Sequence, residues 1–363
     1  MFLTNTASTR TGATNINAGI LNVAKLADGA ANSSIGAATA TAGQLQFGGG
    51  TLQYTGSTAQ STNRLFTLNT GGGTIDASGS VSAATVNFTG TGALDGGTGA
   101  TLRSLTLTGS NAGNNSLAGI LADGTGSAVS LVKSGNGTWA VSGTNTYTGT
   151  TTISAGTLLI NGNQPLATGA VSVASNATLG GNGTVGGATT FTGTSIHSAG
   201  SAAATVGTQN FSSSLTYGNG TIFAWDLDTL TGGDVTDPGL GVSDAATGTY
   251  DQVAAAGAIT GGSAIFKILL ATGDSFADAF WNTDKSWTNI FAGGSGSAPN
   301  LAALFSGFDT SGGVSPTGLV TDRGQFTLST TTNTLNWSAV PEPTTALAGL
   351  LLGAGLLRRR RSA

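Results

Sequence analysis

The sequence predicts an all-β protein, a right-handed parallel β-helix (solenoid) with a C-terminal β-rich cap and a short C-terminal hydrophobic helix. Three observations favour this fold: short apolar bursts between turn residues, segments that recur at intervals of roughly 20 to 25 residues, and little charge. Charged residues make up 8% of the 363 residues, and glycine occurs 60 times. Apolar residues stay at 39%, which favours a packed core over a disordered linker.

Residues 131–162 show the pattern best. They read LVKSGNGTWAVSGTNTYTGTTTISAGTLLING, in which short apolar bursts alternate with Gly, Asn, Ser and Thr. Such runs between turn residues are typical of short strands, and the frequent glycines disfavour a helix. Residues 11–21 match residues 148–158 with both of their glycines aligned, so the same unit occurs at least twice.

A second internal match pairs residues 45–52 with residues 68–75 at an offset of 23 residues. A Gly-Thr or Ala-Thr pair followed by an apolar residue recurs at Thr51, Thr74, Thr101, Thr138, Thr157 and Thr178. Self-similarity at such a period indicates a solenoid in which each repeat forms one coil. The coil strands alternate polar and apolar residues, so one face should fill the core and the other should face water.

The segment SGNGTWAVSGTNTYTGTTTISAGTLLING resembles the autotransporter-associated β-strand repeat, found in long secreted bacterial β-helix proteins. The resemblance is close over about thirty residues and looser in the flanking coils. It implies an exported rod on a Gram-negative-type bacterium. Because the match at residues 11–21 begins partway through a repeat, we expect the natural chain to start further upstream.

Composition predicts three domains. Residues 1–219 should form the β-helix. Residues 220–338 hold eleven of the fifteen aspartates and four of the five tryptophans, which indicates an aromatic and aspartate-rich β cap. Within that cap, residues 222–228 alternate as a strand should, with Asp226 and Asp228 on the solvent face. Residues 325–337 are predicted to form a closing hairpin.

The third domain, residues 339–363, contains three features in order. They are the motif Val340, Pro341, Glu342 and Pro343; an apolar segment with Ala346, Leu347, Leu350, Leu351, Leu352, Leu356 and Leu357; and the cluster Arg358, Arg359, Arg360 and Arg361. This order resembles the PEP-CTERM sorting signal. Arginines stay on the cytoplasmic side, so the body would lie outside the inner membrane. A twelve-residue helix spans about 18 Å of the roughly 30 Å bilayer core, which suits a transient anchor.

This second resemblance implies an exosortase-like membrane transpeptidase as a partner, which would cut near Pro341, Glu342 and Pro343. The precursor would be anchored in the inner membrane, and the mature protein would reach the cell surface or the extracellular matrix. A plain, uncut C-terminal anchor is the alternative. We therefore predict a non-enzymatic structural rod without cofactors.

Few residues are suited to catalysis or metal binding. His197 is the single histidine and cysteine is absent, which excludes a His/Cys metal site. We expect His197 to be solvated or at a coil edge, not catalytic. The nearest approach to a calcium site is the set Asp226, Asp228, Asp234 and Asp237, which lacks EF-hand spacing, so no metal is predicted.

Net charge and the remaining side chains leave two alternative functions. Without residues 341–363 the chain holds 8 basic and 15 acidic residues, a charge of −7 that disfavours nucleic acid as a partner. An adhesin or carbohydrate-binding module would stack extracellular polysaccharide on Tyr54, Tyr147 or Trp139. A polysaccharide lyase or hydrolase would need two carboxylates facing one groove. The pairs Lys25 with Asp28 and Lys133 with Asp123 are expected to be exposed surface charges.

Overall fold

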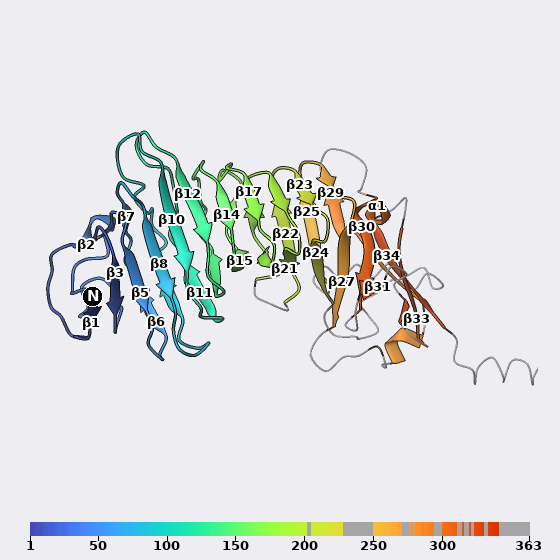
Figure 1. Ribbon diagram of the computed structural model, residues 1–363, viewed down its shortest axis with the longest axis horizontal. Coiled ribbons are helices and arrows are strands. Elements are labelled where there is room, and N and C mark those ends of the chain that lie inside the picture. The colour runs from blue at the N-terminus through green and yellow to red at the C-terminus, as the bar shows by residue number, and fades with distance from the viewer. Residues whose placement is uncertain are drawn as a thin grey trace, which may run out of the picture.

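The computed structural model describes residues 1–201, 205–227, 250–270, 276, 279–282, 284–293, 300–310, 314–315, 319–320, 323–329 and 333–340. These residues form an elongated rod whose short strands stack side by side from the N-terminal end toward the C-terminal end (Figure 1). The strands belong to long parallel ladders that run along the rod. The prediction of an all-β parallel β-helix is confirmed.

Two ladders of eleven strands extend along most of the rod. The first ladder contains β1 (Phe2–Leu3), β3 (Ile20–Val23), β5 (Thr51–Tyr54), β8 (Gly73–Ala77), β10 (Arg103–Thr108), β12 (Val129–Lys133), β14 (Thr151–Ile153), β17 (Val171–Val173), β20 (Thr189–Phe191), β23 (Leu215–Tyr217) and β26 (Ile259–Thr260). The second ladder contains β6 (Gln60–Thr62), β9 (Val86–Phe88), β11 (Asn114–Leu117), β13 (Thr138–Val141), β15 (Gly156–Ile160), β18 (Ala177–Gly181), β21 (Ile196–Ala199), β24 (Ile222–Leu227), β27 (Ala264–Leu270), β30 (Phe305–Asp309) and β31 (Val314–Ser315).

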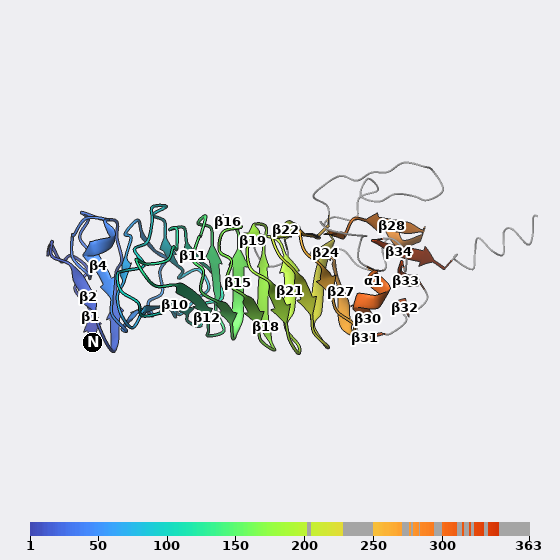
Figure 2. The same ribbon diagram turned by 90° about the horizontal axis from the view of Figure 1, so that it is seen from above.

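Two shorter parallel ladders form a third side. One lies near the N-terminus and contains β2 (Thr14–Ile16), β4 (Leu45–Phe47) and β7 (Thr67–Leu68). The other, here the third ladder, contains β16 (Asn163–Gln164), β19 (Thr184–Val185), β22 (Thr208–Phe211), β25 (Gln252–Ala255) and β29 (Phe291–Gly293). Figure 2 shows β16, β19 and β22 side by side along the rod. The described residues also contain three short helices: η1 (Ala42–Gln44), η2 (Ala279–Asn282) and α1 (Leu301–Leu304).

One coil of the rod consists of three consecutive strands, as in β14, β15 and β16, which lie on the first, second and third ladders. Thr151 pairs with Val171, and Val171 with Thr189, so these coils are 20 and 18 residues long. Gly73 pairs with Leu105, a coil of 32 residues. The predicted interval therefore describes some coils, while others carry longer corners.

Five of the six recurring threonines of the sequence lie in register with another one; Thr101 precedes β10 and belongs to no strand. Thr138 pairs with Thr157, and Thr157 with Thr178, all on the second ladder. Thr51 pairs with Thr74, but on the first ladder. The same short signature therefore marks strands on two different sides of the rod.

Inward-pointing side chains stack in rows, because parallel pairing places corresponding residues of successive coils next to each other. One row of the first ladder runs through Leu52, Ile75, Leu107, Lys133, Ile153, Val173, Phe191 and Tyr217. One row of the second ladder runs through Trp139, Leu158, Leu179, His197, Phe223, Phe266 and Phe308. No member of either row is more than 6% exposed, so both rows belong to the interior.

A four-stranded antiparallel sheet lies at the C-terminal end of the rod (Figures 1 and 2). Its order is β28 (Lys285–Thr288), β34 (Thr334–Ala339), β33 (Gly324–Leu328) and β32 (Leu319–Val320). β33 and β34 form the predicted closing hairpin. Trp287 of this sheet meets Trp225 of the rod with ring centroids 5.5 Å apart, and Phe326 meets Phe308 at 6.2 Å. The sheet therefore continues the aromatic core and covers its end.

The composition change near residue 220 does not interrupt the parallel pairing. β24, β27 and β30 continue the second ladder in parallel, and β25 and β29 continue the third. Among the named strands, antiparallel pairing is confined to the end sheet and β31. The predicted domain boundary at residue 219 thus coincides with a change in amino-acid composition. That residues 1–219 and 220–338 are separate domains stays a prediction.

The solvent face predicted for the strand at residues 222–228 is wrong at Asp226. Asp226 is 5% exposed and Ala224, on the same face, is also 5% exposed. Leu227 forms an antiparallel bridge with Tyr250, and the backbone of Asp226 bonds to that of Asp251. The chain therefore returns beside the end of β24, where Asp226 is buried.

Candidate functional site

The predicted sorting signal lies almost entirely outside the described residues. Val340 is described; it is 51% exposed, and its backbone N–H donates to Arg323 O at 2.8 Å. Pro341, Glu342, Pro343, the apolar segment and the four terminal arginines are not described. Among the described residues, no helix has the length and apolar character needed to cross a bilayer. The sorting signal stays a prediction.

The three aromatic side chains proposed as sugar-stacking platforms are buried, so that prediction is wrong. Trp139, Tyr147 and Tyr54 are 0%, 2% and 3% exposed. Trp139 occupies an inward row, and its indole N–H donates to Thr108 O at 2.8 Å. Tyr147 shares a hydrogen bond of 2.7 Å with the hydroxyl of Thr151, and burial raises its pKa to about 12. These rings fill the core of the rod.

His197 is also buried, at 0% exposure, and not solvated as predicted. Its Nε2 lies 2.9 Å from Gln209 Oε1, and Gln209 Nε2 donates to Gly180 O at 2.8 Å. Gln209 therefore presents an acceptor, which places the imidazole proton on Nε2. Nδ1 then accepts from the hydroxyl of Tyr217 at 2.5 Å. Burial lowers the pKa of His197 to about 4, so the ring is neutral at pH 7 and has no access to a substrate.

Lys133 belongs to the core and is not the exposed partner of Asp123 that the sequence predicted. It is 0% exposed, between Leu107 and Ile153 of the inward row. Its Nζ donates to three backbone carbonyls, of Ser134, Gly135 and Ala155, at 2.7, 2.7 and 3.0 Å. Burial lowers its pKa to about 8. Strand alternation was the available signal, because Lys133 shares the parity of buried Leu131.

Two arginines in the rod are buried in the same manner, each 2% exposed. Arg64 Nη2 donates to Gly36 O at 3.0 Å and its Nε donates to Ala27 O at 3.2 Å. Burial lowers its pKa, and the charge of Arg10 lowers it further. Arg103 donates to Thr101 O at 3.2 Å. These cations satisfy corner carbonyls inside the rod, so they contribute no positive patch to its surface.

Aspartates of the first half bond to separate parts of the rod. Asp76 accepts from Gln53 Nε2 at 2.7 Å, and Asp28 accepts from the backbone N–H of Asn63 at 2.7 Å. Although burial alone would raise it, hydrogen bonds from Thr148 and Val129 lower the pKa of Asp123. Within the described part of the chain, no group of three His, Cys, Asp or Glu side chains could hold a metal ion.

Asp226, a calcium candidate, meets a carboxylate that the sequence did not single out. Asp251 is 0% exposed, and it accepts the backbone N–H groups of Gly207 at 2.9 Å and Asp226 at 3.2 Å. Burial raises the pKa of both acids, and the charge of Asp226 raises that of Asp251 further. The other candidates, Asp228, Asp234 and Asp237, lie outside the described residues.

A neutral outward row extends along the first ladder. We call it the threonine row. It runs in register through Thr51, Thr74, Thr106, Val132, Thr152, Ser172, Thr190, Thr216 and Thr260. None of these side chains is buried, and none is charged. Beside it, the residues just before the last five strands are Thr150, Ala170, Ala188, Ser214 and Ala258.

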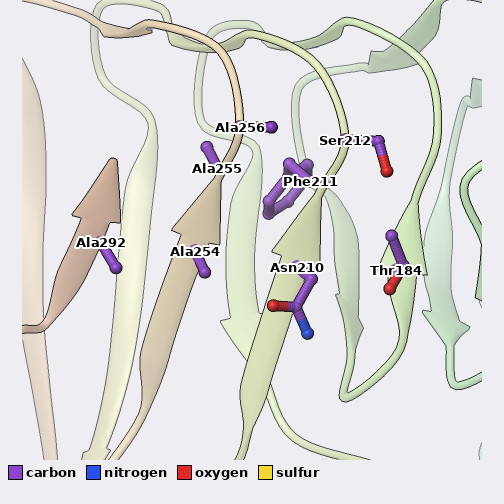
Figure 3. Close-up of a pocket in the computed structure, with 8 residues that line it drawn as sticks. All are labelled: Thr184, Asn210, Phe211, Ser212, Ala254, Ala255, Ala256 and Ala292. Carbon is purple, nitrogen blue, oxygen red and sulfur yellow. The ribbon is translucent and has the colours of Figure 1, made fainter. Parts of the chain in front are cut away.

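The third ladder carries a shallow hollow of about 310 Å³ (Figure 3). Its lining is Thr184, Asn210, Phe211, Ser212, Ala254, Ala255, Ala256 and Ala292. Thr184, Asn210, Ala254 and Ala292 follow one another in register across four strands, so the hollow forms where the outward row changes to alanine. Its lining is uncharged, like the threonine row.

Two comparisons relate the rod to known proteins. Residues 1–23 and 131–160 match the family described as passenger-associated-transport-repeat. The chain is also 35% identical over 140 residues to a protein of Brucella suis biovar 1 (strain 1330) named Adhesin BmaC autotransporter. That match covers 39% of this chain and 4% of the much longer relative. The repeat predicted at residues 131–162, and its second copy near the N-terminus, are confirmed.

Proposed function

We propose that this chain is a rod-shaped part of an exported bacterial surface protein with an adhesin-like, non-enzymatic role. The observation that carries the proposal is the threonine row, an uncharged row of outward side chains that continues through nine strands of the first ladder. The similarity of the chain to a protein named as an autotransporter adhesin supports a place at the cell surface. A buried, neutral His197 supports a role without catalysis.

The proposed contact is a long, neutral polymer such as extracellular polysaccharide. Strands of a ladder lie about 4.8 Å apart, so the row presents a hydroxyl or methyl group at regular short intervals. Each such contact is weak, and a polymer lying along the rod would engage many of them at once. Stacking on Trp139, Tyr147 or Tyr54 has no part in this proposal, because those rings are buried.

The test places charge on the threonine row and compares it with a matched surface. The variant Thr152→Lys/Thr190→Lys changes two outward residues of the first ladder. The control Thr157→Lys/Thr178→Lys changes two outward, half-buried threonines of the second ladder in neighbouring coils. Retention of the purified chain on insoluble cellulose and on cross-linked dextran is measured, with the thermal midpoint as a check on folding.

Binding through the threonine row predicts that the first variant loses retention by about tenfold or more, because two lysines disrupt several adjacent contacts. The control should bind like the wild type. Equal losses in both variants, or no retention of the wild type on either polymer, would contradict the proposed contact.

We propose that residues 339–363 are a sorting signal that an exosortase-like transpeptidase recognises. The support is the order of Val340, Pro341, Glu342 and Pro343, an apolar segment and four arginines in the sequence. Mass spectrometry of the C-terminal peptide from extracellular protein tests it. A peptide that ends near Pro343 and lacks Arg358 to Arg361 is expected. An intact arginine tail on protein in the inner membrane would indicate a plain anchor instead.

A further inference from the structure

Asp226 and Asp251 form a buried acidic pair between the second and third ladders. Asp226 lies in β24, and Asp251 directly precedes β25. The two residues are 5% and 0% exposed. Asp251 Oδ2 lies 3.2 Å from the backbone N of Asp226, so the carboxyl group of Asp251 sits against Asp226. Two negative charges this close in an environment of low polarity repel each other strongly, so both cannot be ionised at little cost.

Asp251 joins three segments of the chain. Its Oδ1 accepts from the backbone N–H of Gly207 at 2.9 Å, and its Oδ2 accepts from that of Asp226 at 3.2 Å. Its own backbone N–H donates to Asp226 O at 3.0 Å, and its carbonyl accepts from the indole of Trp225 at 3.0 Å. The state of this carboxyl group therefore affects the junction of β22, β24 and β25.

Within the described part of the chain, no ion pair of Asp226 or Asp251 with a lysine or arginine is found. The sequence contains neither Lys nor Arg between Lys133 and Lys267. Lys267 stands opposite Ala224 on the neighbouring strand, but its Nζ lies 3.2 Å from Asp309 Oδ2. Opposite Asp226 on β27 is Leu269. Asp226 Oδ2 is buried and has no hydrogen-bond partner among the described residues.

We propose that Asp226 and Asp251 share one proton, and that this proton holds the junction of β22, β24 and β25 together, so that this part of the rod loosens as the pH rises. The proton comes from solvent and returns to it, leaving two carboxylates whose repulsion opens the junction. A carboxylic acid can donate to the partner carboxylate, and that hydrogen bond is lost when the second acid ionises.

The direction of the pH dependence follows from the raised pKa of both acids. A raised pKa means that the folded state binds more protons than the unfolded state above the ordinary carboxyl pKa near 4. The stabilisation is complete below about pH 4 and is lost as the pH rises through the raised values. On the segments that pair with β24 in the described part of the chain, the other titratable groups are His197, Lys267 and Tyr250. Lys267 is paired with Asp309, and the hydroxyl of Tyr250 donates to Thr288 O.

The experiment follows the thermal midpoint of the full chain at about pH 5, 6, 7 and 8 for the wild type, Asp251→Asn and Asp226→Asn. An asparagine keeps the shape of the protonated acid and does not titrate, so each variant should lose much of the pH dependence. The wild type should fall by about 3–8 °C relative to Asp251→Asn between pH 5 and pH 8. Asp123→Asn is the control: the lowered pKa of Asp123 changes stability only at more acidic pH, so its difference from the wild type should stay constant over this range.

Hydrogen exchange keeps the test decisive if a variant fails to fold. In the wild type, the amides of Gly207 and Asp226 both donate to Asp251, so their protection should fall with rising pH more than that of Thr151 in β14. A pH-independent difference between wild type and Asp251→Asn, with unchanged protection at Gly207, would overturn the proposal. Added calcium that raises the wild-type midpoint but not that of Asp226→Asn would also overturn it, because the pair would then hold a cation.

Discussion

Polar residues in the interior of the rod take the positions that strand alternation gives them, whatever their charge. Lys133 and His197 each occupy an inward row between apolar neighbours in the coils before and after. Each is accommodated by hydrogen bonds, Lys133 to three carbonyls and His197 to Tyr217 and Gln209. A buried polar group is tolerated when its partners are in place and becomes costly when one is removed.

His197 gives a direct reading of the interior, because it is the single histidine of the chain. Its pKa is lowered to about 4 by burial. The unfolded chain therefore binds an extra proton between about pH 4 and pH 6.5, and stability falls as the pH drops through this range. We expect its ring resonances in NMR spectra to stay constant from pH 7 to about pH 5. A titration midpoint near 6.5 in the folded protein would contradict this placement.

Lys133→Met should destabilise the rod by about 1–3 kcal/mol, because three corner carbonyls lose their donor while the methylene packing is kept. Removing the buried charge offsets part of this loss. Lys25→Met is the matched control, since Lys25 is exposed and should change stability by less than about 0.5 kcal/mol. Urea denaturation measures both, and equal effects would show that the carbonyl contacts of Lys133 contribute little.

Among the elements, the strand–corner–strand unit of the repeat sets the path of the chain. The two copies place a glycine at the same step, Gly19 before β3 and Gly156 at the start of β15, with φ of +68° and +64°. Side chains are disfavoured in this left-handed region, which accounts for glycine at both. The two units nevertheless lie on different sides of the rod. In the first unit β2 belongs to the short N-terminal ladder and β3 to the first ladder, whereas in the second unit β14 belongs to the first ladder and β15 to the second.

Gly19→Ala and Gly156→Ala separate backbone strain from crowding. A Cβ at Gly19 would have no atom within 4 Å, whereas one at Gly156 would lie 2.4 Å from Gly135 O and 2.7 Å from Lys133 Nζ. Gly19→Ala should therefore lose about 1–2 kcal/mol from strain alone. Gly156→Ala should lose more than about 3 kcal/mol, because the carbonyls around Lys133 must move. Chemical denaturation of both variants measures the difference, and similar losses would contradict the crowding at Gly156.

Element pairing could be predicted from the sequence wherever strand and corner lengths repeat. The 23-residue offset is the true register for Thr51 and Thr74. It fails for the strand before them, where Phe47 pairs with Leu68 at an offset of 21. The stretch from Leu68 to Thr74 is two residues longer than the equivalent stretch from Phe47 to Thr51, and the glycine-rich sequence of these corners does not indicate their length. The burial of Asp226 in β24 was missed for a similar reason, because its partner Asp251 is distant in sequence.

At the scale of the whole molecule, each coil touches mainly the coils before and after it. The free energy of unfolding of such a rod is close to the sum of the stabilities of the single coils and of the interfaces between neighbouring coils. A destabilising substitution should therefore affect its own coil first and then the coils next to it. At the C-terminal end, the antiparallel end sheet adds further contacts to the last coils through Trp287 and Phe326. The composition of the surface does not single out residues that would contact a partner. The sequence therefore indicated an exported rod but assigned the contact role to aromatic residues that are buried.

The rod predicts different outcomes for the same substitution at its end and in its middle. Val23→Asp in β3 and Val173→Asp in β17 each bury a charge at a site that is 1% or 0% exposed. Val23→Asp should remove hydrogen-exchange protection from the N-terminal coils and leave that of β17 and later strands intact, because only one side of the rod depends on it. Val173→Asp should divide the rod, lowering protection in both directions from β17. Hydrogen exchange with mass spectrometry resolves these patterns. Uniform loss of protection in both variants would mean that the rod unfolds as one cooperative unit, and coil-by-coil additivity would then fail.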